Sequence, residues 1–84
     1  MKEVKCDVYR SAKKKYLYLF VSADEGMASV PDELLAQFGE PEKVLSFTLT
    51  HERDLEKEDP VQVLQNLQLQ GYHLQLPHAN EQFV

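Results

Sequence analysis

One short segment, YLYLFV at residues 16–21, sets the strongest limit on how this 84-residue chain folds. Successive side chains of a strand point to opposite faces of its sheet, and here both alternating sets are apolar. Such a strand is typical of the middle of a sheet that is covered on both sides. The segment therefore predicts a central strand, and the rest of the chain has to supply its neighbours and its cover.

The residues before this segment predict its first neighbour. Residues 4–10 (VKCDVYR) alternate between apolar and polar side chains, which is typical of a half-buried strand. Residues 11–15 form a short polar connection, so we expect the two strands to form an antiparallel hairpin. The tip of this hairpin is basic, because it carries Lys13, Lys14 and Lys15.

A helix and a third strand follow. Pro31 suits a first helical turn, Asp32 and Glu33 favour the positive end of the helix dipole, and Gly39 suits the end of the helix. Residues 43–50 then alternate between apolar and polar side chains, with Leu45, Phe47 and Leu49 on the apolar side. They predict a third half-buried strand.

A second helix and a fourth strand complete the pattern. Asp59 is a good N-cap before Pro60, and Gly71 suits the end of this helix. Its apolar face is expected to contain Pro60, Val63, Leu64 and Leu67, with Leu69 on the opposite face. Residues 72–76 alternate and predict a short last strand.

These segments predict a single α+β domain over residues 1–77, with a four-stranded sheet and two helices in the order ββαβαβ, starting with the antiparallel hairpin. Residues 78–84 are expected to form a flexible C-terminal tail. The single cysteine and the absence of a long apolar stretch favour a cytoplasmic protein with no membrane association. Strand order, the sheet faces covered by the helices, and a homodimer are left open.

Charge is distributed unevenly along the chain. The net charge is −5, yet residues 1–22 hold six basic side chains against two acidic ones, a local balance of +4. Basic groups interleaved with tyrosines are the combination that single-strand binders use to meet phosphates and stack on bases. The favoured alternative is that these lysines keep a hairpin tip soluble and protect it from edge-to-edge pairing. Any RNA binding is expected to be weak and sensitive to salt.

The candidate binding surface joins this hairpin to the last strand. If the first and fourth strands lie near each other, residues 9–11 (Tyr9, Arg10, Ser11) converge with Gly71, Tyr72 and Gln75 on a shallow pocket. The alternative is that Tyr72 belongs to the core and that Arg10 pairs with a carboxylate. The full candidate surface is Tyr9, Arg10, Ser11, Lys13, Lys14, Lys15, Tyr16, Tyr18, Tyr72 and Gln75.

No pattern of side chains predicts catalysis, a cofactor or a metal. Cys6, His51, His73 and His78 do not show the paired spacing of a metal site, and Cys6 falls on the predicted core face, where a thiol is inert. The acidic run of residues 52–59 lacks the glycine and the oxygen spacing of a calcium loop. We therefore expect a protein that is not an enzyme.

The chain resembles the YcgL family of small bacterial proteins over nearly its whole length. The segments that carry the resemblance are CDVYRS at 6–11, YLY at 16–18, VPDELL at 30–35 with FGEP at 38–41, and GYHLQLP at 71–77. Met27, where an aromatic residue is expected, and the short sequence after Pro77 depart from the family pattern. The resemblance implies a compact sheet-and-helix domain and does not imply an activity.

The remaining signal is apolar surface. Val61, Leu69 and the outer sides of Tyr16, Tyr18 and Phe20 are expected to exceed what two short helices can cover, and uncovered apolar patches often mark interfaces. The leading hypothesis is therefore a non-enzymatic binding or adaptor module that acts through a protein surface. The alternative is a weak RNA-associated protein that uses the basic hairpin, and an enzyme of unrecognised type comes third.

Overall fold

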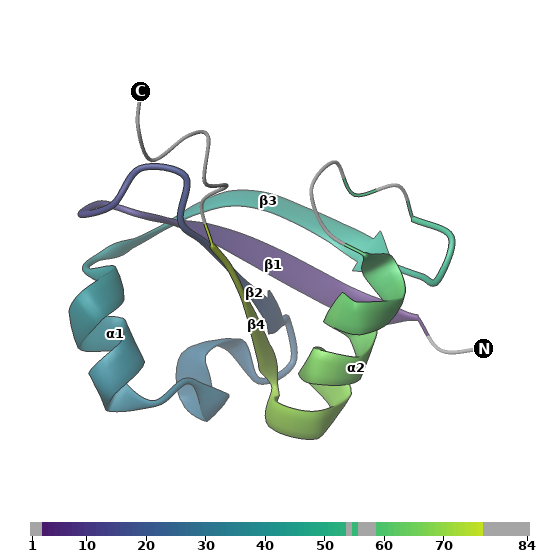
Figure 1. The fold of residues 1–84 in the computed structure, drawn as a ribbon. Helices are drawn as coiled ribbons and strands as arrows, with labels where there is room; N and C mark the ends of the chain where they lie inside the picture. Colours follow the sequence, from purple (N-terminus) through teal and green to yellow (C-terminus); the bar gives the residue numbers. More distant parts are fainter. Residues whose placement is uncertain (1–2, 54, 56–58, 77–84) are drawn as a thin grey trace.

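The computed structural model describes residues 3–53, 55 and 59–76. Within them the chain forms four strands, two α-helices and one short 3-10 helix (Figure 1). The predicted α+β fold and its element order are confirmed, and the 3-10 helix is an addition to them. In chain order the elements are β1 (Val4–Ser11), β2 (Tyr18–Ser22), η1 (Gly26–Ser29), α1 (Asp32–Phe38), β3 (Pro41–Leu49), α2 (Pro60–Gln70) and β4 (Tyr72–Gln75).

The four strands form one antiparallel sheet in the order β3-β1-β2-β4. The β1–β2 hairpin is present as expected, with Arg10 opposite Tyr18 and Cys6 opposite Ser22. β2 is an inner strand, as its two apolar faces predicted. β1 is also an inner strand, and β3 and β4 form the two edges.

The two helices cover opposite faces of the sheet (Figure 1). α2 packs on the face that carries Cys6, Val8 and Phe20, which we call the α2 face. α1 and η1 pack on the face that carries Leu19 and Val21, which we call the α1 face. Each face therefore has its own apolar core, and the two helices do not share one face.

The ends of both helices follow from local signals. The Asp59 carboxylate accepts a hydrogen bond from the amide of Val61 at 3.0 Å, and Gly71 ends α2 in the left-handed conformation with φ of 88°. Pro31 is the N-cap of α1 and lies one position before the predicted first turn, since its backbone is extended. As predicted, α2 buries Val63, Leu64 and Leu67 and leaves Leu69 84% exposed.

The sequence pattern misplaced the start of β2 and the burial of β3. β2 starts at Tyr18 and not at Tyr16, because Tyr16 has a positive φ of 65° and belongs to the hairpin connection. β3 starts at Pro41 and is mostly exposed, since it lies at an edge of the sheet, and only Leu49 at its end is buried in the core with α2. Phe20 is buried, and its expected exposure was wrong.

Two further findings concern what the described residues contain. None of their helices is long and apolar enough to cross a membrane. The tail expected at 78–84 and part of the acidic run, namely residues 54 and 56–58, lie outside the described residues.

A candidate binding groove on the α2 face

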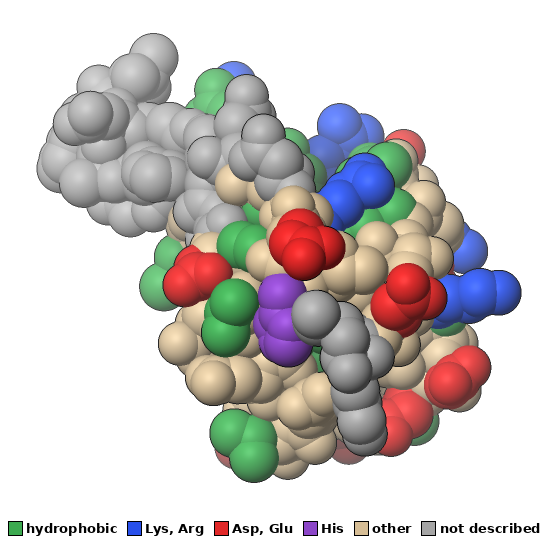
Figure 2. Space-filling model, turned by 90° about the vertical axis from the view of Figure 1, so that its right-hand side faces the viewer, with side chains coloured by type: hydrophobic (Ala, Val, Ile, Leu, Met, Phe, Trp, Pro, Cys, Tyr) green, Lys and Arg blue, Asp and Glu red, His purple; other side chains and the backbone are tan. Residues whose placement is uncertain are grey.

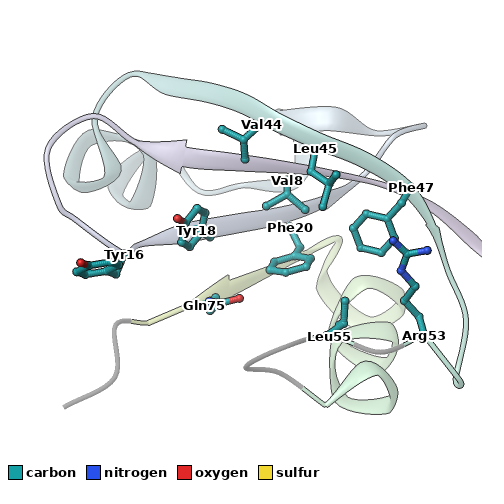
Figure 3. A pocket seen from close by; sticks show the side chains of 10 residues that line it. All are labelled: Val8, Tyr16, Tyr18, Phe20, Val44, Leu45, Phe47, Arg53, Leu55 and Gln75. Atoms are coloured by element: carbon teal, nitrogen blue, oxygen red, sulfur yellow. The ribbon is translucent and has the colours of Figure 1, made fainter. Parts of the chain in front are cut away.

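α2 covers only one end of its sheet face, and the other end is hollow (Figure 3). The hollow has a volume of about 430 Å³, which lies in the range of small ligand sites. Strands β1, β2 and β3 supply its floor and one wall, and Arg53 and Leu55 lie at the end next to α2. We call this hollow the groove, and its lining residues are Val8, Tyr16, Tyr18, Phe20, Val44, Leu45, Phe47, Arg53, Leu55 and Gln75.

A β-bulge in β3 shapes the wall of the groove. Leu45 lies opposite Val8, and Lys43 lies opposite Tyr9, so Val44 is an extra residue without a partner in β1. A bulge of this kind interrupts the alternation of side chains between the two faces. As a result the neighbours Val44 and Leu45 both line the groove, where a regular strand would turn one of them away.

Several large apolar side chains of the groove are exposed. Leu45 is 50% exposed, Val44 is 43% exposed and Tyr16 is 40% exposed. Phe47 is half-buried, and the Arg53 guanidinium lies over its ring at 4.5 Å from the ring centre. Contiguous exposed apolar side chains of this kind are typical of binding surfaces.

A second, more polar hollow of about 410 Å³ lies at the hairpin and shares Tyr16 and Tyr18 with the groove. We call it the basic end, and its lining residues are Arg10, Ser11, Ala12, Lys13, Lys14, Lys15, Tyr16, Tyr18 and Glu42. The two hollows are therefore adjacent, and the first is mainly apolar while the second is cationic. Figure 2 shows a different end of the molecule, where acidic side chains are spread widely and basic side chains lie mainly towards one edge.

Several of the predicted site residues hold the hairpin in place. Ser11 is buried, and its hydroxyl donates to the carbonyl of Phe38 and accepts from the amides of Lys13 and Lys14. The Lys13 ammonium donates to the carbonyl of Ala36 at 3.1 Å, which also ties the hairpin to α1. These contacts give Ser11 and Lys13 a structural role.

Arg10 is engaged as well, since its guanidinium forms a hydrogen-bonded ion pair with the Glu42 carboxylate. This hydrogen bond raises the pKa of Arg10 further above its ordinary value. In contrast, neither Lys14 nor Lys15 has an ion pair with another described residue. The charges of Lys13, Lys14 and Lys15 are therefore not compensated by an ion pair among the described residues, and only Lys13 has its ammonium engaged by a backbone carbonyl.

The predicted pocket between the first and fourth strands is not formed. β2 separates β1 from β4, and Tyr9 and Tyr72 pack with the core of the α1 face. Their side chains lie across the sheet from Gln75, which lines the groove. The condition for that convergence is not met, and the alternative holds, since Tyr72 packs with a core and Arg10 pairs with the Glu42 carboxylate.

The remaining candidate residues do come together, along with residues that the pattern missed. Tyr18 lies opposite both Arg10 and Gln75, so these three form one row across the α2 face. The missed groove residues include Val44 and Leu45, whose adjacent apolar side chains in an otherwise alternating strand were the available signal. Arg53 and Leu55 had no such signal, because they follow β3 in a segment without periodicity.

The chemistry of the described residues offers little for catalysis. Cys6 is 1% exposed, and burial, followed by the neighbouring Asp7 charge, raises the pKa of its thiol to about 12. A thiol with such a pKa is a poor nucleophile at neutral pH. No three His, Cys, Asp or Glu side chains in the described part of the chain are grouped so that they could hold a metal ion.

Comparison with known proteins identifies the family. A family model described as the YcgL domain matches residues 6–78, which is most of the chain. The chain belongs to the YcgL domain family. The resemblance carried by the sequence segments at both ends of the domain is thereby confirmed.

Similar proteins come from several bacteria. YcgL domain-containing proteins of Pseudomonas paraeruginosa and Pseudomonas putida are 43% and 44% identical to this chain over 79 residues. One from Azotobacter vinelandii is 42% identical over the same length. In each case the match covers 94% of this chain and 81% of the relative. The names of these relatives give the YcgL domain and no catalytic activity.

Proposed function

We propose that this YcgL domain is a binding module that takes a segment of another protein into the groove on the α2 face. The observation that carries the proposal is the apolar hollow beside the uncovered part of the sheet, with Val44, Leu45 and Tyr16 each about half as exposed as a fully open side chain. Burying such side chains against a partner contributes roughly 25 cal/mol per Å² of apolar area removed from water, before the costs of association.

The composition of the groove favours a protein partner over RNA. Val44, Leu45 and Leu55 are aliphatic, so they offer neither a stacking surface for bases nor a hydrogen bond to their edges. Arg10, which lies in one row with Tyr18 and Gln75, is already paired with Glu42. Apolar side chains of a peptide fit this lining better than nucleotides do.

The composition also favours binding over catalysis. Among the residues that the structure describes, the groove lining contains a single charged side chain, Arg53, and no carboxylate, histidine, cysteine or serine. General acid–base and nucleophilic catalysis need such groups within hydrogen-bond reach of the substrate. The groove supplies shape and apolar area instead.

The proposal is tested with peptides selected from a random displayed library on the immobilised full chain. Each selected peptide is then titrated, by fluorescence anisotropy, against the wild type and against Leu45→Glu. A carboxylate placed in the apolar groove is expected to weaken binding about tenfold or more, because docking would desolvate it. Circular dichroism checks that the variant is folded, as expected for a side chain that is 50% exposed.

Leu69→Glu is the matched control, because Leu69 is an exposed leucine on the outer side of α2. Its peptide affinities are expected to stay within about twofold of the wild type, since surface changes away from a site have small effects. If Leu45→Glu binds the selected peptides as well as Leu69→Glu does, the groove is not the binding site and the proposal is wrong.

A further inference from the structure

We infer that the segment bound in the groove is acidic next to its apolar anchors, and that Lys14 and Lys15 at the basic end bind its carboxylates. This inference rests on the proposed function and specifies the chemical class of the partner. It depends on the junction of two hollows of different character, which share Tyr16 and Tyr18.

The two hollows are close enough for one short peptide to occupy both. Their shared tyrosines lie at the start of β2 and in the connection before it, so the basic end begins where the apolar lining stops. An extended peptide advances about 3.3 Å per residue, so a few residues separate side chains over Leu45 from side chains over the hairpin. Anchors and carboxylates would therefore be neighbours in the partner sequence.

The positive charge available to a partner comes from the lysines of the basic end. The Lys13 ammonium keeps its charge but is held by a backbone carbonyl of α1, and Arg10 is paired with Glu42. Lys14 and Lys15 are exposed and have no ion pair within the described residues. Two cations beside an apolar hollow favour a ligand that brings negative charge to that end and apolar groups to the other.

The lysines of the hairpin matter because the chain as a whole is acidic. A protein of net charge −5 repels acidic partners at long range, so an acidic segment binds only where cations outweigh that field locally. The hairpin is such a place. At the opposite end of the groove, Arg53 lies over the ring of Phe47 and adds a further cation to the lining.

The test uses matched synthetic peptides. The first has three glutamates followed by leucine, leucine, serine and phenylalanine, and the second replaces each glutamate with glutamine. We expect the glutamate peptide to bind the wild type about tenfold more tightly at low salt, about 50 mM, and the difference to shrink at about 0.5 M, since salt screens exposed charges. Titration by fluorescence anisotropy measures the affinity of each peptide at each salt concentration.

Two double variants test whether Lys14 and Lys15 cause the preference for the glutamate peptide. Lys14→Gln with Lys15→Gln is expected to remove the preference for glutamate and to leave the affinity for the glutamine peptide unchanged. Lys5→Gln with Lys43→Gln changes the net charge equally, and the preference should survive there. Neither control lysine lines the groove or the basic end, and Lys43 lies 3.7 Å from the Asp7 carboxylate.

The outcomes separate this inference from the proposed function. Equal binding of both peptides by the wild type, with loss of both in Leu45→Glu, overturns the inference and supports the groove. Peptide binding that is unaffected by Leu45→Glu overturns the groove and the inference together. An oligouridylate of about ten nucleotides that binds the wild type through Lys14 and Lys15, and displaces the peptides, would assign the surface to RNA and contradict both.

Discussion

At the residue scale, the buried thiol of Cys6 shows how the interior of the domain changes the pKa of a side chain. It lies on β1 between Ser22 and Phe47 and contributes to the core of the α2 face. The neutral thiol behaves there as a small apolar group, and its charged form would lose hydration. The pKa of the thiol therefore rises from an ordinary value of 9.0 to about 12 on folding.

This shift predicts a loss of stability in alkali. Between pH 9 and 12 the unfolded chain releases the thiol proton while the folded chain keeps it, so rising pH favours unfolding. Below pH 9 both states hold the proton, and the effect vanishes. Urea denaturation from pH 8 to 10.5 should show the free energy of unfolding of the wild type falling by up to about 1.4 kcal/mol per pH unit more steeply than that of Cys6→Ala.

The comparison with Cys6→Ala isolates the contribution of the thiol to the pH dependence. The lysines and tyrosines are the same in both proteins, so their contributions cancel. The alanine variant is expected to be less stable than the wild type at pH 7, since it loses buried volume. A stability difference between the two proteins that stays constant from pH 8 to 10.5 would contradict the assigned role of the thiol.

At the scale of the elements, Gly71 joins α2 to β4 under two constraints. Its φ is 88°, which side chains disfavour, and a Cβ atom built there would lie 2.5 Å from the Cβ and hydroxyl of Ser29. Gly26 has a φ of 57° and no heavy atom within 4 Å of such a Cβ. The two glycines therefore share the backbone constraint and differ in the space around them.

We expect Gly26→Ala to cost about 1 kcal/mol, the usual price of a left-handed alanine, and Gly71→Ala to cost more. The additional cost comes from moving η1 away from the turn, because Ser29 belongs to η1. Urea denaturation of both variants measures the difference. Equal losses would mean that η1 shifts freely and that only the backbone conformation matters at Gly71.

The elements themselves were readable from the sequence because their signals are local. Asp59, Pro60 and Gly71 mark the ends of α2 through contacts with their own neighbours. The strand order was not readable, since the pairing of β3 with β1 joins residues far apart in the chain. For the same reason the sequence misjudged β3, whose exposure follows from its place at the sheet edge.

The sequence likewise predicted one part of the candidate site and missed another. The basic hairpin was visible as a cluster of lysines and tyrosines, and Tyr16, Tyr18 and Gln75 do line the groove. Tyr9 and Tyr72 were misplaced, because a strand pattern gives alternation and not the identity of the face that remains open. The part played by Val44 depends on a bulge between two strands, which neither strand reveals alone.

For the whole molecule, the main feature is that two cores share one sheet. Phe20 faces the core under α2, and its neighbours Leu19 and Val21 face the core under α1 and η1. Neither core can lose its packing without disturbing β2. We therefore expect the domain to unfold in one cooperative transition, as small domains usually do.

One substitution in each core tests this cooperativity. Leu64→Ala, on α2, is expected to lower the free energy of unfolding by about 2–5 kcal/mol, and Phe38→Leu, on α1, by a smaller amount. Each should shift the transitions seen by circular dichroism and by tyrosine fluorescence together. Separate midpoints for the two signals in either variant would show that the cores unfold independently.

The bulge in β3 also determines how the chain would respond to a change of length. Deleting a residue from a strand normally turns the residues on one side of the cut to the wrong face. Without Val44, however, Lys43 still meets Tyr9 and Leu45 still meets Val8, so the ladder with β1 closes without a gap. A chain shortened at this point should fold, whereas deletion of Ser46 should destabilise it, and urea denaturation would rank the two. Val44 is thus an insertion that the sheet can lose, at the expense of one wall of the groove.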